Sequence, residues 1–124
     1  MLRIVLIEPN TVLARQYSEA ITDELNEVVI AHSAETALSA LDAPTDMIVL
    51  ELQLGPHNGL ELLYEIRSYE DLAETPVVVL SNVSSSYVTN AKSYELLGIS
   101  EYLYKPQTTL RSLKRTITSL LEDD

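Results

Sequence analysis

The chain of 124 residues contains no cysteine, no tryptophan and no phenylalanine, and it has only three glycines. Without cysteine, the chain cannot form disulfides, thiol nucleophiles or thiolate metal sites. None of the three glycines belongs to a Gly-x-x-x-x-Gly-Lys phosphate-binding loop. The core must therefore be built from aliphatic side chains, and a hydrophobic content of 46% is enough for one domain over residues 1–124.

Basic side chains are also scarce. Eight Lys and Arg residues stand against 19 Asp and Glu, so the formal net charge is −11. Nucleic acids and anionic membranes should repel such a chain, and we expect neither as a direct partner. After Arg3 only four apolar residues follow in a row, which is too short for a signal peptide or a membrane span. We therefore expect a cytoplasmic protein.

Apolar residues alternate between strand-like runs and helical spacing along the whole chain. The strand-like segments are 2–7, 27–32, 46–52, 75–81 and 99–105. Helical spacing follows around residues 13–25, 34–41, 62–66, 84–97 and 110–120. Parallel neighbours need long crossover connections, so this alternation predicts an α/β fold, a doubly wound five-stranded parallel sheet with five helices.

Polar side chains stand at the ends of four predicted strands. In an open parallel sheet, functional groups gather outside the carboxyl ends of the strands. Glu51 ends an apolar strand, where a charge is costly unless it is paired, and we expect Lys105 to pair with it. The strand-end residues that we expect to form one pocket are Glu8, Pro9, Glu51, Ser81, Asn82 and Lys105.

Three segments around these strand ends resemble the receiver domain of two-component response regulators, the CheY-like family. The segments are "DMIVLELQLGPHNGLELL" (46–63), "TPVVVLSN" (75–82) and "GISEYLYKP" (98–106). The resemblance covers essentially the whole chain and implies the flavodoxin-like strand order 2-1-3-4-5. Receivers are similar in using an Asp after strand three as nucleophile toward a phosphohistidine, with two acids after strand one that help to hold Mg²⁺.

The resemblance also implies roles for individual residues. Glu8 matches the first of the two acids after strand one. Ser81 and Lys105 match the hydroxyl and the lysine that contact the incoming phosphoryl group. Tyr102 matches an aromatic residue that changes rotamer with the activation state.

Two positions depart from the family pattern. Glu51 replaces the nucleophilic Asp, and its extra methylene moves the carboxylate oxygens by roughly 1 Å, an error that can cost about 10²-fold in rate. Pro9 replaces the second acid and has no side-chain oxygen. We expect no catalytic residue and no dedicated metal site, although Glu8, Glu51 and a backbone carbonyl could hold Mg²⁺ weakly.

We therefore predict a signal-transduction receiver module with a degenerate phosphoacceptor pocket. It would be no enzyme and would act by phosphorylation-independent contacts with a histidine kinase, a phosphotransferase or an output protein. One alternative is a working phosphoacceptor that tolerates Glu51. A more distant alternative is a small nucleotide- or flavin-binding enzyme on the same scaffold.

Several residues allow two interpretations. Glu8 is either a solvated loop acid or a remnant metal ligand, and Ser81 could simply bond to the backbone. Tyr87, Tyr94 and Tyr104 lie in a region that resembles the docking and dimerisation face of receivers, helix 4, strand 5 and helix 5. They could form an interface there, including a homodimer, or be half-buried packing residues.

Overall fold

The computed structural model describes residues 1–89 and 94–122, without the side chains of residues 87, 89, 94 and 96. Its central feature is a parallel sheet whose strands run in the order β2-β1-β3-β6-β7. The strands are β1 (Leu2–Ile7), β2 (Asn26–Ala31), β3 (Met47–Leu50), β6 (Val77–Ser81) and β7 (Ile99–Tyr104). Because β6 and β7 are the fourth and fifth predicted strands, the predicted 2-1-3-4-5 order is confirmed.

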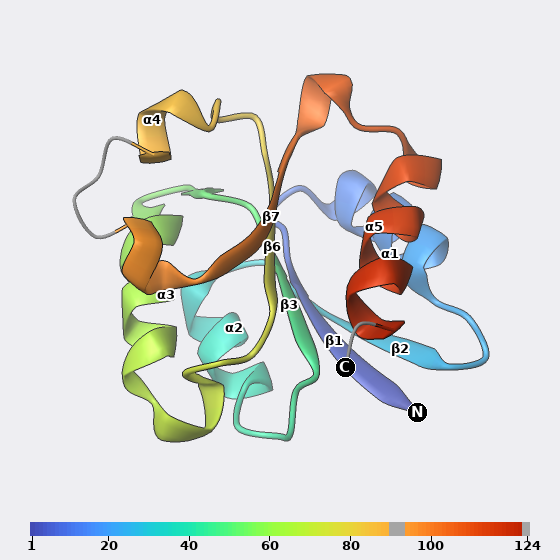
Figure 1. Cartoon of the computed structure of the whole chain (residues 1–124), viewed down its shortest axis with the longest axis horizontal. Helices are drawn as coiled ribbons and strands as arrows, with labels where there is room; N and C mark the ends of the chain where they lie inside the picture. Colours follow the sequence, from blue (N-terminus) through green and yellow to red (C-terminus); the bar gives the residue numbers. More distant parts are fainter. Residues whose placement is uncertain (90–93, 123–124) are drawn as a thin grey trace.

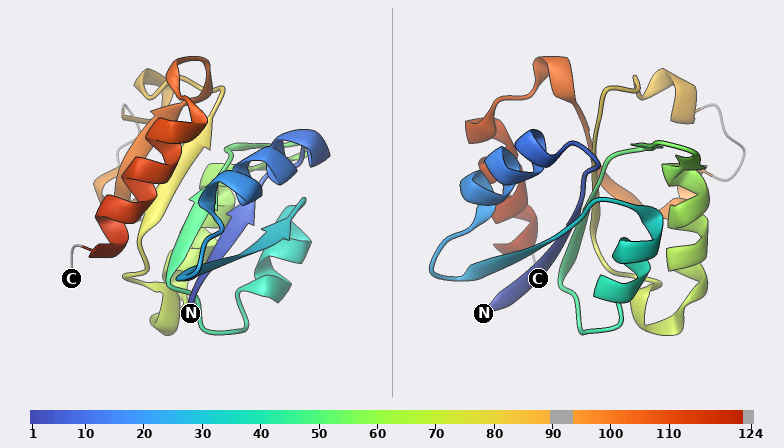
Figure 2. Two further views of the ribbon diagram at one scale, coloured as in Figure 1. Left: turned by 90° about the vertical axis from the view of Figure 1, so that its right-hand side faces the viewer. Right: turned by 180° about the vertical axis from the view of Figure 1, so that it is seen from behind.

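Helices cover both faces of the sheet (Figures 1 and 2). The helices on one face are α1 (Thr11–Ile21) and α5 (Leu110–Glu122). The helices on the other face are α2 (Ala34–Ala40), α3 (Gly59–Ser68) and α4 (Ser86–Thr89). Among the described residues, no helix is long and apolar enough to cross a membrane.

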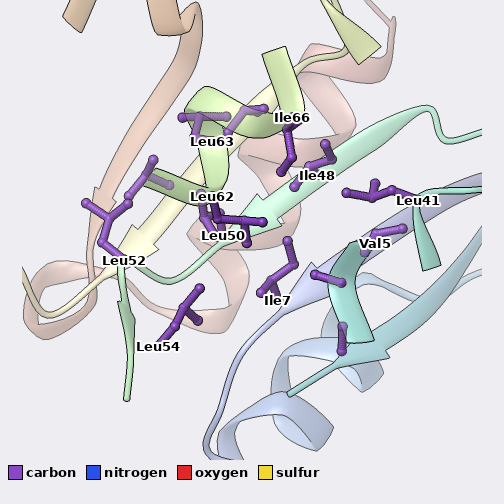
Figure 3. Close-up of a cluster of buried hydrophobic side chains, with 14 of the residues drawn as sticks. Val5, Ile7, Leu41, Ile48, Leu50, Leu52, Leu54, Leu62, Leu63 and Ile66 are labelled. Carbon is purple, nitrogen blue, oxygen red and sulfur yellow. The ribbon is translucent and has the colours of Figure 1, made fainter. Parts of the chain in front are cut away.

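The core lies in two layers, one on each face of the sheet. All four residues of β3 are fully buried, because a central parallel strand is covered on both faces. Ile48 and Leu50 of β3 belong to the same cluster as Leu62, Leu63 and Ile66 of α3 (Figure 3). Packing of this kind fixes where β3 ends, and therefore where the residue after it is placed.

Helix and turn signals in the sequence also appear in the structure. The Asn10 side chain accepts a hydrogen bond from the Leu13 amide at 2.9 Å, so Asn10 is the N-cap of α1. Ser33 and Thr36 form a reciprocal capping box at the start of α2. Gly98, directly before β7, has a φ of 60°, a conformation that favours glycine.

Two predicted segments differ in detail. The strand predicted over 46–52 ends at Leu50, and a hairpin of β4 (Gln53–Leu54) and β5 (His57–Asn58) follows it, which Gly55 makes possible with a φ of 69°. The helix predicted over 84–97 begins at Ser86, and its described end, Tyr94–Leu97, is a 3₁₀ turn. The segment is rich in Ser and Asn, which compete with the helix for backbone hydrogen bonds.

Candidate functional site

The strand ends bring four of the predicted residues together. Glu8 follows β1, Glu51 follows β3, Ser81 ends β6 and Lys105 follows β7. The two glutamates are 2% and 3% exposed, and Ser81 is completely buried. A buried charge is costly unless it is paired and hydrogen-bonded, so the partners of these side chains determine what the site can do.

Lys105 lies between the two carboxylates. Its Nζ atom is 2.6 Å from Glu8 Oε1 and 2.7 Å from Glu51 Oε1, and its side chain is 8% exposed. Burial by itself lowers the pKa of Lys105, but the hydrogen bonds that Lys105 donates to Glu51 and Glu8 outweigh it, and the pKa lies above its ordinary 10.5. The predicted Glu51–Lys105 pair is therefore present, and Glu8 completes a bridge that was not predicted.

Both carboxylate oxygens of Glu51 accept hydrogen bonds. Oε2 accepts from Ser81 Oγ and from the Gln53 amide at 3.1 Å. Oε1, which pairs with Lys105, also accepts from the Asn82 amide at 3.4 Å. Burial raises the pKa of Glu51, but the bonds from Lys105, Ser81 and Gln53 outweigh it, and the pKa lies below its ordinary 4.5. Glu51 is therefore an ionised carboxylate, and each of its two oxygens already accepts two hydrogen bonds.

A chain of hydrogen bonds leads from Glu51 to Tyr102. Ser81 Oγ donates to Glu51 and accepts from the Val83 amide at 3.0 Å. The Val83 carbonyl in turn accepts from the Tyr102 hydroxyl. Tyr102 is half-buried and packs against the cluster that contains the core of α3. The chain fixes the loop between β6 and α4 to both Glu51 and β7.

Glu8 is not the solvated loop acid that was one of its two predicted interpretations. Its Oε2 atom accepts from the Asn10 amide at 3.0 Å, and Oε1 pairs with Lys105. The Glu8 backbone carbonyl lies 3.0 Å from His32 Nδ1. Because Glu8 directly follows the apolar strand β1, it is buried at the carboxyl end of the sheet, where it pairs with Lys105.

The residues present do not fit a Mg²⁺ site well. The Lys105 ammonium lies between Glu8 and Glu51, where a cation shared by the two carboxylates would have to bind. Pro9 is exposed and its side chain offers no oxygen. No group of three His, Asp or Glu side chains suited to a metal is found within the described ranges. Mg²⁺ requires several oxygen ligands in near-octahedral geometry, and the carboxylates of Glu8 and Glu51 are both already paired with Lys105.

Sequence reasoning missed two neighbours of the site. The ring of Tyr17 in α1 is buried, and its centroid is 5.9 Å from Lys105 Nζ. Burial raises the pKa of Tyr17 more than the nearby Lys105 lowers it. The second neighbour is His32, which lies beside Glu8. The parallel register that pairs Ile7 with Ala31 would have placed it there.

The predicted interface tyrosines are placed only in part. Tyr104 is half-buried and lines a hollow together with Asn82 and Val83, beside the Glu51 pocket. The side chains of Tyr87 and Tyr94 lie outside the described part of the structure. Their interface role therefore stays a prediction.

Residues 4–118 match the family model of the response regulator receiver domain. Among characterised relatives, the transcriptional regulatory protein CpxR of Klebsiella pneumoniae is 31% identical over 106 residues, 86% of this chain and 44% of CpxR. CiaR of Streptococcus pneumoniae is 30% identical over 122 residues, 98% of this chain and 52% of CiaR. The chain thus spans about half the length of these relatives.

Solved structures of response regulators have the same fold. The Mn²⁺-bound form of response regulator Rcp1 superposes with a TM-score of 0.82 at 24% identity, covering 100% of this chain and 97% of Rcp1. Chemotaxis response regulator CheY4 of Vibrio cholerae gives 0.82 at 21% identity, covering 97% and 98%. The phosphorylated cyanobacterial phytochrome response regulator RcpA gives 0.76 at 29% identity, covering 98% and 91%.

Proposed function

This chain belongs to the response regulator receiver domain family, and from that premise we propose that its phosphoacceptor pocket is degenerate. In this proposal Glu51 does not accept a phosphoryl group but keeps the pocket in one conformation. The domain then signals by docking to another protein without being phosphorylated. Receiver domains interact with kinases and output domains in two-component systems, so such proteins are the expected partners.

The observation that supports this proposal most directly is that both carboxylate oxygens of Glu51 already accept hydrogen bonds. The Glu51 carboxylate already takes up the Ser81 hydroxyl and the Lys105 ammonium, which the family uses to contact an incoming phosphoryl group. An attack by Glu51 on phosphorus would require both partners to be released. Because phosphoryl transfer depends mainly on positioning and charge neutralisation, the loss of both would slow it severely.

Glu51 also imitates part of a phosphorylated aspartate. It places a negative charge beside Ser81 and Lys105, although with one charge where a phosphoryl group would carry nearly two. Through Ser81 and Val83 this charge is connected to the Tyr102 hydroxyl on β7. A permanent carboxylate would hold the β6–α4 loop in place without an input signal.

The surface that we propose for docking is formed by α4, β7 and α5. β7 is an edge strand of the sheet, and the hydrogen-bond chain from Glu51 ends on it at Tyr102. Leu110, at the start of α5, is 45% exposed. We propose an output or kinase protein as the occupant of this surface, with a homodimer as the alternative that light scattering would reveal.

The proposal is tested with acetyl phosphate and Mg²⁺, followed by intact mass spectrometry. We expect no adduct of about 80 Da, the mass of one phosphoryl group. A receiver known to accept phosphate from acetyl phosphate serves as positive control. A stoichiometric adduct that is stable in acid, labile in base and absent from Glu51→Gln would overturn the proposal.

A second experiment tests the conformational role of Glu51. In the Glu51→Gln variant, we expect ¹⁵N–¹H resonances of Val83, Tyr102 and their neighbours to shift, because Ser81 loses a charged acceptor. The control variant Glu19→Gln removes the same charge from an exposed position on α1 and should leave these resonances in place. Equal spectra for both variants would mean that Glu51 does not hold the loop.

One alternative has a specific observation in its favour. Ser81 and Lys105 provide the hydroxyl and the lysine that the family uses to contact a phosphoryl group, although in this structure both are bound to Glu51. The mass-spectrometric experiment decides between the two. For the nucleotide- or flavin-binding enzyme we find no such support, because the loop after β1 has no glycine and Pro9 has no amide hydrogen to offer a phosphate.

A further inference from the structure

Helices α2 and α3 run side by side on one face of the sheet (Figures 1 and 2). A groove lies between them. It consists of two adjoining hollows of about 200 and 340 Å³ that share Leu38. The first extends toward the start of α3, and the second extends toward the turn after it, Glu70–Leu72. The groove therefore follows most of the length of α3.

The floor of the groove is apolar. Leu38 of α2 is only partly buried and faces both hollows. Leu62 lines the first hollow, and Leu41 and Leu72 line the second. These three leucines are 4–5% exposed and belong to the core cluster beneath the helices. A partner with an apolar side would gain hydrophobic contact here.

The rim of the groove is acidic, and none of its described lining residues is a Lys or Arg. The lining acids, all exposed, are Glu35, Asp42, Glu61, Glu65 and Asp71. Arg67 is the only Lys or Arg in the sequence between residues 33 and 76. Its guanidinium donates to four backbone carbonyls, those of residues 72, 75, 97 and 98, at 2.7–3.0 Å. Arg67 is thus fully engaged in joining α3 to the start of β7.

We propose that this groove docks a basic amphipathic helix of a partner protein. The apolar floor fits one face of such a helix, and the acidic rim on both sides fits Lys and Arg on its flanks. A helix as long as α3, ten residues, spans about 15 Å, or nearly three turns. A second copy of this chain is a poor occupant, because two molecules of net charge −11 repel each other.

The groove is built by α2 and α3, whereas the proposed signalling surface is built by α4, β7 and α5. None of the residues that line it takes part in the bridge of Glu8, Lys105 and Glu51. Docking in the groove is therefore independent of whether Glu51 accepts a phosphoryl group. The two proposals can fail separately.

The test uses a synthetic helical peptide with leucines spaced i, i+3, i+4 and i+7 and lysines elsewhere, titrated into the ¹⁵N-labelled chain. We expect perturbed resonances along α2 and α3. The Glu61→Gln/Glu65→Gln variant should weaken binding about fivefold or more, because two rim charges are lost. The Glu19→Gln/Glu27→Gln variant removes two exposed charges outside the groove and should change the affinity less than twofold.

Two further measurements separate docking from general attraction to a negative protein. A peptide with the same leucines and glutamates in place of lysines should not bind. Leu38→Ser, checked for folding by circular dichroism, should weaken binding of the basic peptide without changing the net charge. The proposal is overturned if the perturbed resonances are spread over several faces, if both Gln pairs weaken binding equally, or if Leu38→Ser has no effect in the folded protein.

Discussion

Replacing Lys105 with methionine removes the ammonium that two buried carboxylates share. Methionine matches the apolar stem of lysine as far as Cε, so the change removes mainly the charged ammonium group. Glu8 and Glu51 would remain at 2% and 3% exposure in the native packing, with their hydrogen bonds to backbone amides but without a cation. The variant therefore measures how much the buried bridge contributes to the stability of the fold.

The expected loss is large. Removing one partner from a buried ion pair costs about 3–5 kcal/mol, because the remaining charge is desolvated without compensation. Lys105 has two such partners, so we expect at least about 4 kcal/mol at pH 7, a large part of the ~5–15 kcal/mol that stabilises a typical domain. This corresponds to a melting temperature lower by about 10–15 °C.

The assay is urea denaturation followed by far-ultraviolet circular dichroism, at pH 7 and again near pH 4. In the variant, burial raises the pKa of Glu51 with no ammonium to oppose it, so protonation of Glu51 at low pH should recover part of the lost stability. Lys114→Met is the matched control, because Lys114 pairs with Asp23 on the surface, with side chains 30% and 38% exposed. Its effect should be much smaller. If the two variants lose equal stability, or if the loss in Lys105→Met does not depend on pH, the reasoning is wrong.

Three other predictions follow from the same structure. The Glu51 pKa lies below 4.5 and the Lys105 pKa above 10.5, so both groups should contribute fully to stability between pH 4.5 and 10.5. The contribution of Glu51 should be lost as the pH falls through its lowered pKa, and that of Lys105 as the pH rises through its raised pKa. Urea midpoints measured against pH test this, and Glu51→Gln should weaken the loss of stability at acidic pH. Gly59→Ala would place a Cβ atom 2.5 Å from Leu52 Cα, so the backbone around Leu52 would have to shift. We expect the free energy of unfolding to fall by about 1–3 kcal/mol in the same assay. An unchanged urea midpoint would contradict the close contact between Gly59 and Leu52. Arg67→Met should lower the free energy of unfolding by about 2–4 kcal/mol, because four backbone carbonyls lose their hydrogen-bond donor. Amide hydrogen exchange should become faster in the 94–98 segment. Unchanged exchange there would show that Arg67 does not hold this segment in place.

The fold was predictable because its signals are local. Runs such as 46–52 and 75–81 are apolar at consecutive positions, as strands buried on both faces must be, and the helices between them follow a 3.6-residue period. Features that depend on a single backbone angle were harder to predict from the sequence. The sequence "GPHNG" indicates a turn, but the hairpin of β4 and β5 depends on the conformation of Gly55 and on contacts with the start of α3.

The pocket was predictable only as a set of strand-end residues. The carboxyl ends of parallel strands must meet, so Glu51 and Lys105 could be placed together although they are 54 positions apart. That Glu8 is buried could not be derived, because a loop acid before a helix is equally compatible with solvent. Whether the acid is buried depends on how far α1 and α5 cover the end of β1.

The sequence by itself determined the class of fold, because this follows from periodicity. It also carried the resemblance to the receiver family, and that resemblance implied the strand order. It also determined the two departures from the family pattern, Glu51 and Pro9. Only the tertiary structure decided that one ammonium pairs with both carboxylates and that Tyr17 lies near it. The physical reason is that charge pairing depends on side-chain rotamers and on the register between strands, and neither of these produces a periodic pattern in the sequence.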